Sequence, residues 1–565
     1  MKKYYQRLFI RGGNNTVNIY YPIILYIIFI ILCIPTGKYL SMVISYQKNF
    51  FDKIFDPIDN LIFKITCVKK ENMTWKEYCL SLLCTNFFIF LMAFAAFRFQ
   101  NILFNAPSFN TALSFNSAVS FITNTNLQDY SGEDASLITT LIIISLMFVS
   151  AASGFAVAAA FIRGLMKESG LGNFFVDITR IITRVLIPLS IIVSVFLIFN
   201  NVPQTFKGTK VIQTIEGSYQ AIKLGPVAAL ESIKHIGTNG GGIFSANSSH
   251  PYENPNMATN TIEMLSMMLL PGSLVLAYGF LLKNKKQGII LFITMSILFI
   301  ISTIVLIWAE KSGNPILANI GLSQSMGNME GKEVRFGIIG SSLFSSVTTS
   351  FTTGSVNNMH DSLTPIGGFI TLWNMMLNVI FGGKGIGLIS ILIYAMLTVF
   401  ISGLMVGRTP EFLGKKLEEK EIKIICFSML IHPILVLIPT AVSLIFKSDA
   451  VTNPGFHGLS QILYQFTTSS ANNGSGFEGL LDNTNYWNLL TGITMFLGRY
   501  TLIVLALWLV DSLRSKREVP ETEFTFRTDN LTFAIILIFV ILVIGALTFL
   551  PVLALGPVSE HLMIH

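Results

Sequence analysis

Long apolar runs alternate with polar segments along most of the 565-residue chain. A helix that crosses the hydrocarbon core of a bilayer needs about 20 predominantly apolar residues, and ten runs approach that length. The pattern predicts an all-α integral membrane protein with about ten transmembrane helices, built as a single membrane domain over residues 1–565. The runs are 20–37, 78–98, 137–160, 184–200, 262–282, 288–308, 386–406, 424–446, 488–512 and 531–550.

The composition supports a membrane protein. Hydrophobic residues make up 52% of the chain and charged residues only 12%, which is about half the charged share of a soluble globular protein. The net charge of +7 fits the cytoplasmic loops of a membrane protein, so we infer no nucleic-acid partner from it. The five cysteines are odd in number and lack metal-ligand spacing, which indicates neither a disulfide framework nor a zinc site.

Lysine and arginine gather in alternate loops between the apolar runs. Residues 99–136, by contrast, contain neither. The positive-inside rule therefore predicts that the basic loops are cytoplasmic and that both termini are outside. The basic loops hold Lys48, Lys53, Lys69, Lys70, Lys76, Arg163, Lys167, Arg180, Arg184, Lys283, Lys285, Lys286, Arg408, Lys415, Lys416, Lys420, Lys423, Arg514, Lys516 and Arg517.

The N-terminal tail disagrees with this orientation. It holds Lys2, Lys3, Arg7 and Arg11, although the loops place it outside. A secretory signal peptide also begins with basic residues, but no small-residue cleavage site follows the first apolar run. We expect 20–37 to be a retained helix.

Each long loop on the predicted outer side repeats one pattern. A semi-apolar stretch of about three helical turns precedes a cluster rich in Thr, Asn and Gly, and the clusters end at the regularly spaced positions 126, 240, 354 and 474. Such spacing indicates an internal repeat. The semi-apolar stretches are 110–122, 225–236, 336–350 and 455–470. The predicted units are 78–160, 184–282, 288–406 and 424–512, with extra spans at 20–37 and 531–550.

The clusters have the chemistry of a cation filter. Non-helical backbone at membrane depth is tolerated only inside protein or along a watery cavity, so we expect four re-entrant loops, each after a pore half-helix, in a pseudo-fourfold, channel-like arrangement. Backbone carbonyls and Thr hydroxyls can replace the water shell of a cation. Because the clusters contain no Asp or Glu, they favour potassium over calcium or magnesium. Plain exterior turns are the alternative. The predicted filter residues are Thr123, Asn124, Thr125, Asn126, Gly237, Thr238, Asn239, Gly240, Thr352, Thr353, Gly354, Asn472, Asn473 and Gly474.

Several residues in or near the clusters have candidate roles. We expect Gly240, Gly354 and Gly474 to adopt backbone angles that a Cβ would forbid, and each half-helix to direct its partly negative C-terminal end at the ion. Glu231, in the second half-helix, either attracts cations or holds a neighbouring loop. Gln128, just after the first cluster, either faces the pore mouth or makes a structural hydrogen bond.

Two features are expected on the inner side of the filter. Arg499 lies within an apolar run, where an unpaired charge is costly; it is either a positive barrier against cation leak or an arginine that reaches the membrane interface. The run 381–387 interrupts another apolar stretch and predicts a gate-like loop that breaks the second span of the third unit. A simple kink or an exterior turn is the alternative. The glycines of interest in this run are Gly382, Gly383 and Gly385.

Long segments around and between the clusters carry a specific resemblance. They include TNTNLQDYSGE (123–133), GTNGGGIFSANSSHPYENP (237–255), GRTPEFLGKK (407–416), SSANNGSGFEGL (469–480) and ALTFLPVLALGP (546–557). From about residue 70 to its end, the chain strongly resembles the potassium-binding A subunits of the Kdp potassium-transporting P-type ATPases. Residues 1–20 form a longer and more basic tail than is usual in that family.

The resemblance implies a division of labour. This chain would select potassium at the outer face of a bacterial cell membrane. A partner P-type ATPase subunit would hydrolyse ATP and receive the ion through an intramembrane tunnel, and a single-span accessory subunit would complete the complex in the membrane lipid. The chain contains neither a Gly-x-x-x-x-Gly-Lys-Ser/Thr phosphate loop nor the Asp-Lys-Thr-Gly-Thr motif of P-type ATPases, so we expect it to have no catalytic site and no ATP site.

Two other functions stay open on the sequence. A stand-alone potassium channel or secondary transporter would use a similar filter without partners, although the long matching segments outside the clusters favour the pump subunit. A membrane enzyme would need ligands such as His250, Glu253 and His360, whose spacing matches no metal site.

Overall fold

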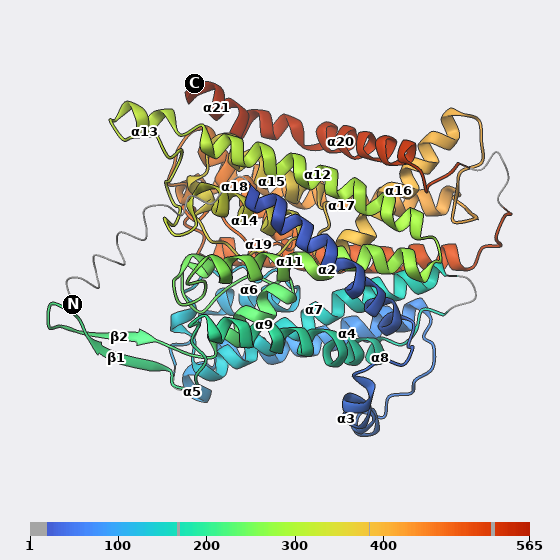
Figure 1. Ribbon diagram of the computed structural model, residues 1–565, viewed down its shortest axis with the longest axis horizontal. Coiled ribbons are helices and arrows are strands. Elements are labelled where there is room, and N and C mark those ends of the chain that lie inside the picture. The colour runs from blue at the N-terminus through green and yellow to red at the C-terminus, as the bar shows by residue number, and fades with distance from the viewer. Residues whose placement is uncertain (1–19, 105, 167–169, 384, 521–525, 565) are drawn as a thin grey trace.

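The protein is a bundle of helices that lie side by side (Figure 1). The computed structural model describes residues 20–104, 106–166, 170–383, 385–520 and 526–564. The predicted location of the basic tail, with Lys2, Lys3, Arg7 and Arg11, falls outside these residues, as does loop residue Lys167. Within the described ranges, ten helices are long and apolar enough to cross a membrane, which confirms the predicted all-α membrane fold.

Every predicted apolar run falls on one of these ten spans. The spans are α2 (Tyr20–Ile44), α4 (Trp75–Arg98), α7 (Leu137–Leu165), the continuous helix α8–η3–α9 (Phe174–Ile181, Ile182–Leu186 and Ile187–Phe199), α11 (Met257–Leu281), α12 (Lys285–Lys311) with the short α13 (Pro315–Asn319), α16 (Ile386–Met405), α17 (Glu419–Phe446), α19 (Asn485–Arg514), and α20 (Leu531–Leu553), which continues through η7 (Ala554–Val558) into α21 (Ser559–Ile564).

Four shorter helices coincide with the predicted half-helices. They are α6 (Thr111–Ile122), α10 (Val227–Ile236), α14 (Gly337–Ser350) and α18 (Phe456–Ala471). Each lies in the chain between two spans and ends directly before one of the Thr/Asn/Gly clusters. Helix α6 begins at a capped end, where the Asn110 side chain accepts a hydrogen bond from the Leu113 amide at 2.8 Å; such a cap satisfies one of the free amides of the first turn.

The two ends of the bundle are distinct (Figure 1). One end carries α5 (Gln100–Phe104), α13 and the antiparallel hairpin of β1 (Thr209–Gln213) and β2 (Tyr219–Lys223), and we call it the hairpin end. The opposite end carries α3 (Asp52–Ile65), and we call it the α3 end. A minimal second hairpin joins β3 (Glu411–Phe412) to β4 (Lys415–Lys416).

The helix predicted to start at residue 184 begins instead at Phe174. Its first turns contain Arg184, which is fully buried and bonds Asp52 at 3.0 Å, Asp56 at 2.5 Å and Asp59, all on α3. A hydropathy pattern ends at such charges because it cannot show that they are paired inside the protein. The predicted start was therefore wrong, and a segment expected to be a basic loop is a helix anchored on α3.

Candidate functional site

The four clusters meet in the interior, and hydrogen bonds join two pairs of neighbours. Asn124 of the first cluster donates from Nδ2 to the Thr238 carbonyl oxygen of the second at 2.9 Å. Asn472 of the fourth cluster donates from Nδ2 to Thr125 Oγ1 of the first at 2.9 Å. The first cluster therefore lies between the second and the fourth, although the chain positions are far apart.

Close backbone contacts join the remaining pairs. A methyl group added to Gly240 would lie 3.2 Å from the Thr353 carbonyl oxygen, and one added to Gly354 would lie 2.2 Å from the Asn473 carbonyl oxygen. The second cluster thus lies against the third, and the third against the fourth. The four clusters form a closed ring.

The structure brings all of the predicted filter residues to this ring, and nearly all are fully buried. Gly474 alone is partly exposed. The buried members are Thr123, Asn124, Thr125, Asn126, Gly237, Thr238, Asn239, Gly240, Thr352, Thr353, Gly354, Asn472 and Asn473. They are not exterior turns, so that alternative is wrong.

The backbone angle φ at the last residue of each cluster shows where glycine is favoured. Gly354 (φ +82°) and Gly474 (φ +104°) have left-handed backbone, as predicted, and Asn126 (φ +58°) takes the same conformation at the corresponding position. Asn tolerates that region better than most residues. The prediction for Gly240 was wrong, because the positive φ falls on Gly241 (+76°) instead. Gly240 instead lies against the third cluster, where a methyl group would be crowded at 3.2 Å by the backbone of Thr353 and Gly354.

Polar atoms inside the ring suit a hydrated or dehydrated cation. The hydroxyl of Thr353 and both side-chain amide atoms of Asn126 are buried without a hydrogen-bond partner in the described part of the chain. Buried polar groups normally find a partner in the protein or in an ordered water or ion. The C-terminal ends of four half-helices, each with a partial negative charge, face the same region.

Gln128 links the first two loops just beyond the ring. Its Oε1 accepts a hydrogen bond from the Gly242 amide at 2.6 Å. A methyl group added to Gly241 would lie 2.9 Å from the same oxygen. Gln128 therefore makes a structural hydrogen bond beside the ring, and this contact fixes the exit of the second loop against the first.

The glycine run in the third unit breaks a span, as predicted. Helix α15 (Pro365–Leu377) ends at Asn378 in left-handed backbone (φ +47°), and α16 starts at Ile386. The Gly382 amide donates to the Ser350 carbonyl oxygen, at the C-terminal end of α14, at 3.0 Å. A methyl group on Gly383 would lie 3.3 Å from the Thr352 carbonyl oxygen. The loop thus packs against the third cluster of the ring, and it is neither an exterior turn nor a simple kink.

Two further contacts hold this loop. Gly385 (φ +82°) packs so closely on α7 that a methyl group would lie 2.5 Å from the Gly154 carbonyl oxygen. The ring of Phe381 stacks on that of Phe351, the residue before Thr352, with centroids 4.7 Å apart. The conformation of the loop is therefore tied to that of the third cluster.

Arg499 lies in α19 beside the end of the fourth half-helix. Its neighbour Gly498 lets α19 approach α18 closely, since a methyl group there would lie 2.5 Å from the Ser470 carbonyl oxygen. Arg499 is only 7% exposed. In the part of the chain that the structure describes, it has no ion-pair partner, and its Nη2 makes no hydrogen bond. An arginine that reaches the membrane interface would be exposed, so this arrangement favours the barrier interpretation.

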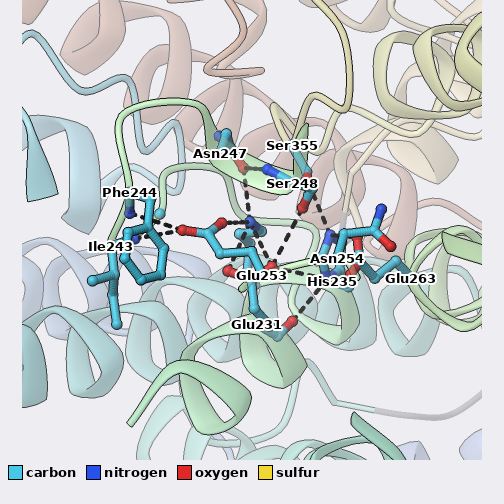
Figure 2. Close-up of polar contacts among 12 residues, drawn as sticks. Glu231, His235, Ile243, Phe244, Asn247, Ser248, Glu253, Asn254, Glu263 and Ser355 are labelled. Carbon is cyan, nitrogen blue, oxygen red and sulfur yellow. Dashed lines mark hydrogen bonds and ion pairs between the residues drawn. The ribbon is translucent and has the colours of Figure 1, made fainter. Parts of the chain in front are cut away.

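A buried charge network supports the second loop (Figure 2). Lys234 Nζ lies 2.7 Å from Glu231 Oε2, 3.1 Å from Glu253 Oε2 and 2.7 Å from Asn247 Oδ1. Glu253 Oε1 accepts hydrogen bonds at 2.9 Å from the amides of two residues just beyond the second cluster, Ile243 and Phe244. Glu231 therefore acts in holding a neighbouring loop, which was one of the two roles considered for it.

The third loop is joined to the same network through His235. Its Nε2 lies 2.9 Å from Ser355 Oγ, directly after the third cluster, and 3.4 Å from Glu263 Oε2 of α11. The sequence interpretation missed Lys234, His235 and Glu263. The signal was present, because Glu231, Lys234 and His235 have the i, i+3, i+4 spacing of one helix face, and ionisable residues at membrane depth are rare and usually functional.

The predicted alternative ligands do not form one site. His250 stacks on Phe244 with ring centroids 4.0 Å apart, and His360 bonds Tyr464 Oη at 2.9 Å. Glu253 belongs to the charge network. Among the described residues, the one group of three potential metal ligands is Glu231, His235 and Glu263.

The fold defines a class of multi-pass membrane proteins with four half-helices around a central ring. One solved structure is similar: the potassium transporter TrkH from Vibrio parahaemolyticus matches with a TM-score of 0.52 over 86% of this chain and 97% of the TrkH chain, at 12% sequence identity. This likeness shows the fold alone.

The family follows from sequence comparison. The model of the potassium-transporting ATPase A subunit family, KdpA, matches residues 23–562. Two potassium-transporting ATPase potassium-binding subunits are similar: that of Clostridium acetobutylicum is 53% identical, covering 95% of this chain and 98% of its own, and that of Geobacillus kaustophilus is 51% identical, covering 96% and 98%. The chain belongs to the potassium-transporting ATPase A subunit family.

Proposed function

We propose that this chain is the potassium-binding and potassium-selecting subunit of an ATP-driven uptake pump. The closed ring of four buried, uncharged loops is the observation that carries the proposal. Rings of backbone carbonyls replace the water shell of potassium in other selective pores, and no carboxylate lies in the clusters to recruit a divalent ion. The relatives' names, which describe a potassium-binding subunit of an ATPase, support the same function.

The proposed path has three parts. Potassium enters the ring from the hairpin end and is held by the four clusters, the predicted filter. The loop that contains Gly382, Gly383 and Gly385 gates the inner side, and the charge of Arg499 opposes free passage of cations beyond it. The ion then leaves through an intramembrane tunnel to a catalytic P-type ATPase subunit, with a single-span accessory subunit completing the complex. This chain is the non-catalytic member, and potassium is its transported substrate.

We also propose an internal organisation and an orientation. The four units 78–160, 184–282, 288–406 and 424–512 each supply one filter loop. The hairpin end faces the outside of a bacterial cell membrane, because the basic loops lie at the other end.

Helix α3 supports a membrane contact at the cytoplasmic side. Its carboxylates face Arg184, whereas Ile54, Leu61 and Ile65 are 56%, 58% and 73% exposed. A helix with one apolar face beside basic residues is typical of the interface of a bilayer. We place that apolar face on the lipid of the cytoplasmic leaflet.

Reconstitution in sealed vesicles tests the pump-subunit function. The purified chain alone should bind potassium but neither hydrolyse ATP nor carry a sustained potassium flux. Adding the ATPase and accessory subunits should give potassium-stimulated hydrolysis and uptake. The same complex with Gly240→Asp, which puts a carboxylate into the contact between the second and third loops, should lose most of its potassium affinity. A robust ATP-independent flux through the lone chain would instead establish a channel or secondary transporter.

A further inference from the structure

The tautomer of His235 is fixed by its backbone partner. Its Nδ1 lies 2.8 Å from the carbonyl oxygen of Glu231, one turn earlier in α10. A carbonyl oxygen only accepts hydrogen bonds, so Nδ1 carries the ring proton. The neutral ring therefore presents a lone pair at Nε2.

That lone pair faces a second acceptor. Glu263 Oε2 lies 3.4 Å from His235 Nε2, and the Glu263 side chain is fully buried. Neither carboxylate oxygen of Glu263 has a hydrogen-bond partner in the described part of the chain. Figure 2 shows the two side chains directed toward one another in the buried cluster. The Ser355 hydroxyl, 2.9 Å from Nε2, can donate to the lone pair, whereas the Glu263 carboxylate keeps two oxygens that a cation could bind.

The charges of the cluster indicate how large that cation should be. Glu231, Glu253 and Glu263 are fully buried; the first two contact the ammonium group of Lys234, and Glu263 lies beside His235. With a neutral imidazole, the cluster has two more negative charges than positive ones. An uncompensated ion in a protein interior costs several kcal/mol, and a divalent cation would neutralise both charges.

We propose that Glu231, His235 and Glu263 form a buried site for one divalent transition-metal ion of the zinc type. Their ligand atoms all lie within 4.8 Å of one another. The 3.4 Å between Nε2 and Oε2 is close to the roughly 3.3 Å that separates two ligands placed about 2.0–2.1 Å from a tetrahedral metal. Imidazole nitrogen with carboxylate oxygen is a ligand set that zinc accepts.

The surroundings of His235 support the assignment. Metal-binding histidines usually donate their other ring N–H to a carbonyl or carboxylate oxygen, which orients the ring, and the contact from Nδ1 to the Glu231 carbonyl is of this kind. None of the three ligands belongs to the four clusters. The metal would hold α10 to α11 behind the second filter loop, and Ser355 would connect it to the third.

Zinc content of the purified complex tests the site. After exposure to micromolar zinc and extensive dialysis against metal-free buffer, elemental analysis should find one zinc per chain. Glu263→Gln keeps the side-chain shape and removes a ligand charge, and it should weaken zinc binding by more than the roughly 10–100-fold that loss of an outer-shell partner costs. His432→Gln is the matched control, because His432 also has a buried, unpartnered Nε2 but no ion pair with a carboxylate among the described residues; this variant should retain the zinc.

X-ray absorption at the zinc edge of the parent protein is a second test, which holds even if Glu263→Gln fails to fold. The parent protein should show nitrogen and oxygen ligands at about 2.0–2.1 Å with an imidazole contribution. Sulfur ligands, no imidazole, or no zinc in the parent would overturn the proposal; the last result would mean that protons alone compensate the cluster. Both experiments measure bound zinc, so their outcome is independent of whether the chain serves potassium transport.

Discussion

Gly474 and Asn126 occupy corresponding positions in the fourth and first clusters, and both have left-handed backbone. The two positions differ in how much space is left for a side chain at the α-carbon. A methyl group added to Gly474 would lie 1.9 Å from the Thr125 carbonyl oxygen, so only glycine fits there. At Asn126 the side chain is accommodated, which explains how the first cluster dispenses with glycine.

Gly474→Ala should therefore distort the ring at the contact between the fourth and first loops. We expect at least a tenfold loss of apparent potassium affinity in potassium-stimulated ATP hydrolysis by the assembled complex, which corresponds to about 1.4 kcal/mol. Gly476→Ala is the matched control two residues away, where a methyl group meets nothing within 4 Å. Unchanged potassium affinity in the Gly474 variant would remove this residue from the filter.

Arg499 should control leak more than stability. Arg499→Met removes a charge that pairs with no carboxylate among the described residues, so the melting temperature should change little while passive potassium leak through reconstituted complexes rises several-fold. Arg163→Met is the contrasting variant. It leaves the buried Asp177 without its ion-pair partner, which costs about 3–5 kcal/mol, and should lower the melting temperature. Parental leak with Arg499→Met would refute the barrier.

Among the elements, the half-helices were predicted within a residue or two. Their apolar sequences end at polar clusters, and the structure ends α6 and α10 at Ile122 and Ile236, where the predicted stretches end. The hydropathy pattern did not predict helices in which charged residues are buried as ion pairs. Helix α3 was expected to be loop, because Asp52, Asp56 and Asp59 interrupt its apolar residues and their partner Arg184 lies far along the chain.

The candidate site also has one part that the sequence predicted and one part that it did not. The ring was predictable because each cluster carries its own local signature, repeated four times. For the support behind it, the helical spacing of Glu231, Lys234 and His235 marked the residues but not their partners. Lys234 gains its role from Glu253 and Asn247, which the following loop brings back to α10. Likewise, the contact of His235 with Glu263 depends on how two helices pack, and no local pattern encodes it.

One polar contact ties the C-terminal helix to the fourth half-helix and should respond to pH. His457, at the start of α18, bonds Asp361 Oδ1 at 3.0 Å and Glu560 Oε1 of α21 at 2.8 Å. Burial lowers the pKa of His457, but the hydrogen bonds to Asp361 and Glu560 outweigh it and raise the pKa to about 9. The raised pKa means that this contact stabilises the folded protein fully below about pH 6.5. The contribution is lost as the pH rises through about 9.

The melting temperature of the detergent-solubilised protein should accordingly fall between pH 7 and pH 10. Burial also raises the pKa of Glu478 to about 8, and this group changes stability in the same direction, so the test is the difference between parent and variant. His457→Gln should remove part of the fall. His250→Gln is the control, because burial lowers the pKa of His250 and the ring is neutral over this range. Parallel curves for parent and His457→Gln would contradict the assignment.

For the molecule as a whole, the orientation has a direct test in a native cysteine. Cys67 is exposed at the α3 end, whereas Cys84 and Cys426 lie in the spans α4 and α17. A charged, membrane-impermeant thiol reagent should modify Cys67 in inside-out vesicles and not in intact cells. Ile215→Cys, at the fully exposed tip of the β1–β2 hairpin, made in a Cys67→Ser background, should show the reverse. The opposite pattern would invert the proposed orientation.

The contact between Gly474 and Thr125 also orders the events of biosynthesis. Ring closure joins the first cluster of the chain to the last, so the nascent protein holds an open, incomplete arrangement until its final quarter has been synthesised and inserted. A ribosome that stalls or a message that ends early leaves a fragment without a finished pore. Truncated copies would therefore lack the complete ring, because its closing contact forms only after the fourth cluster has been made.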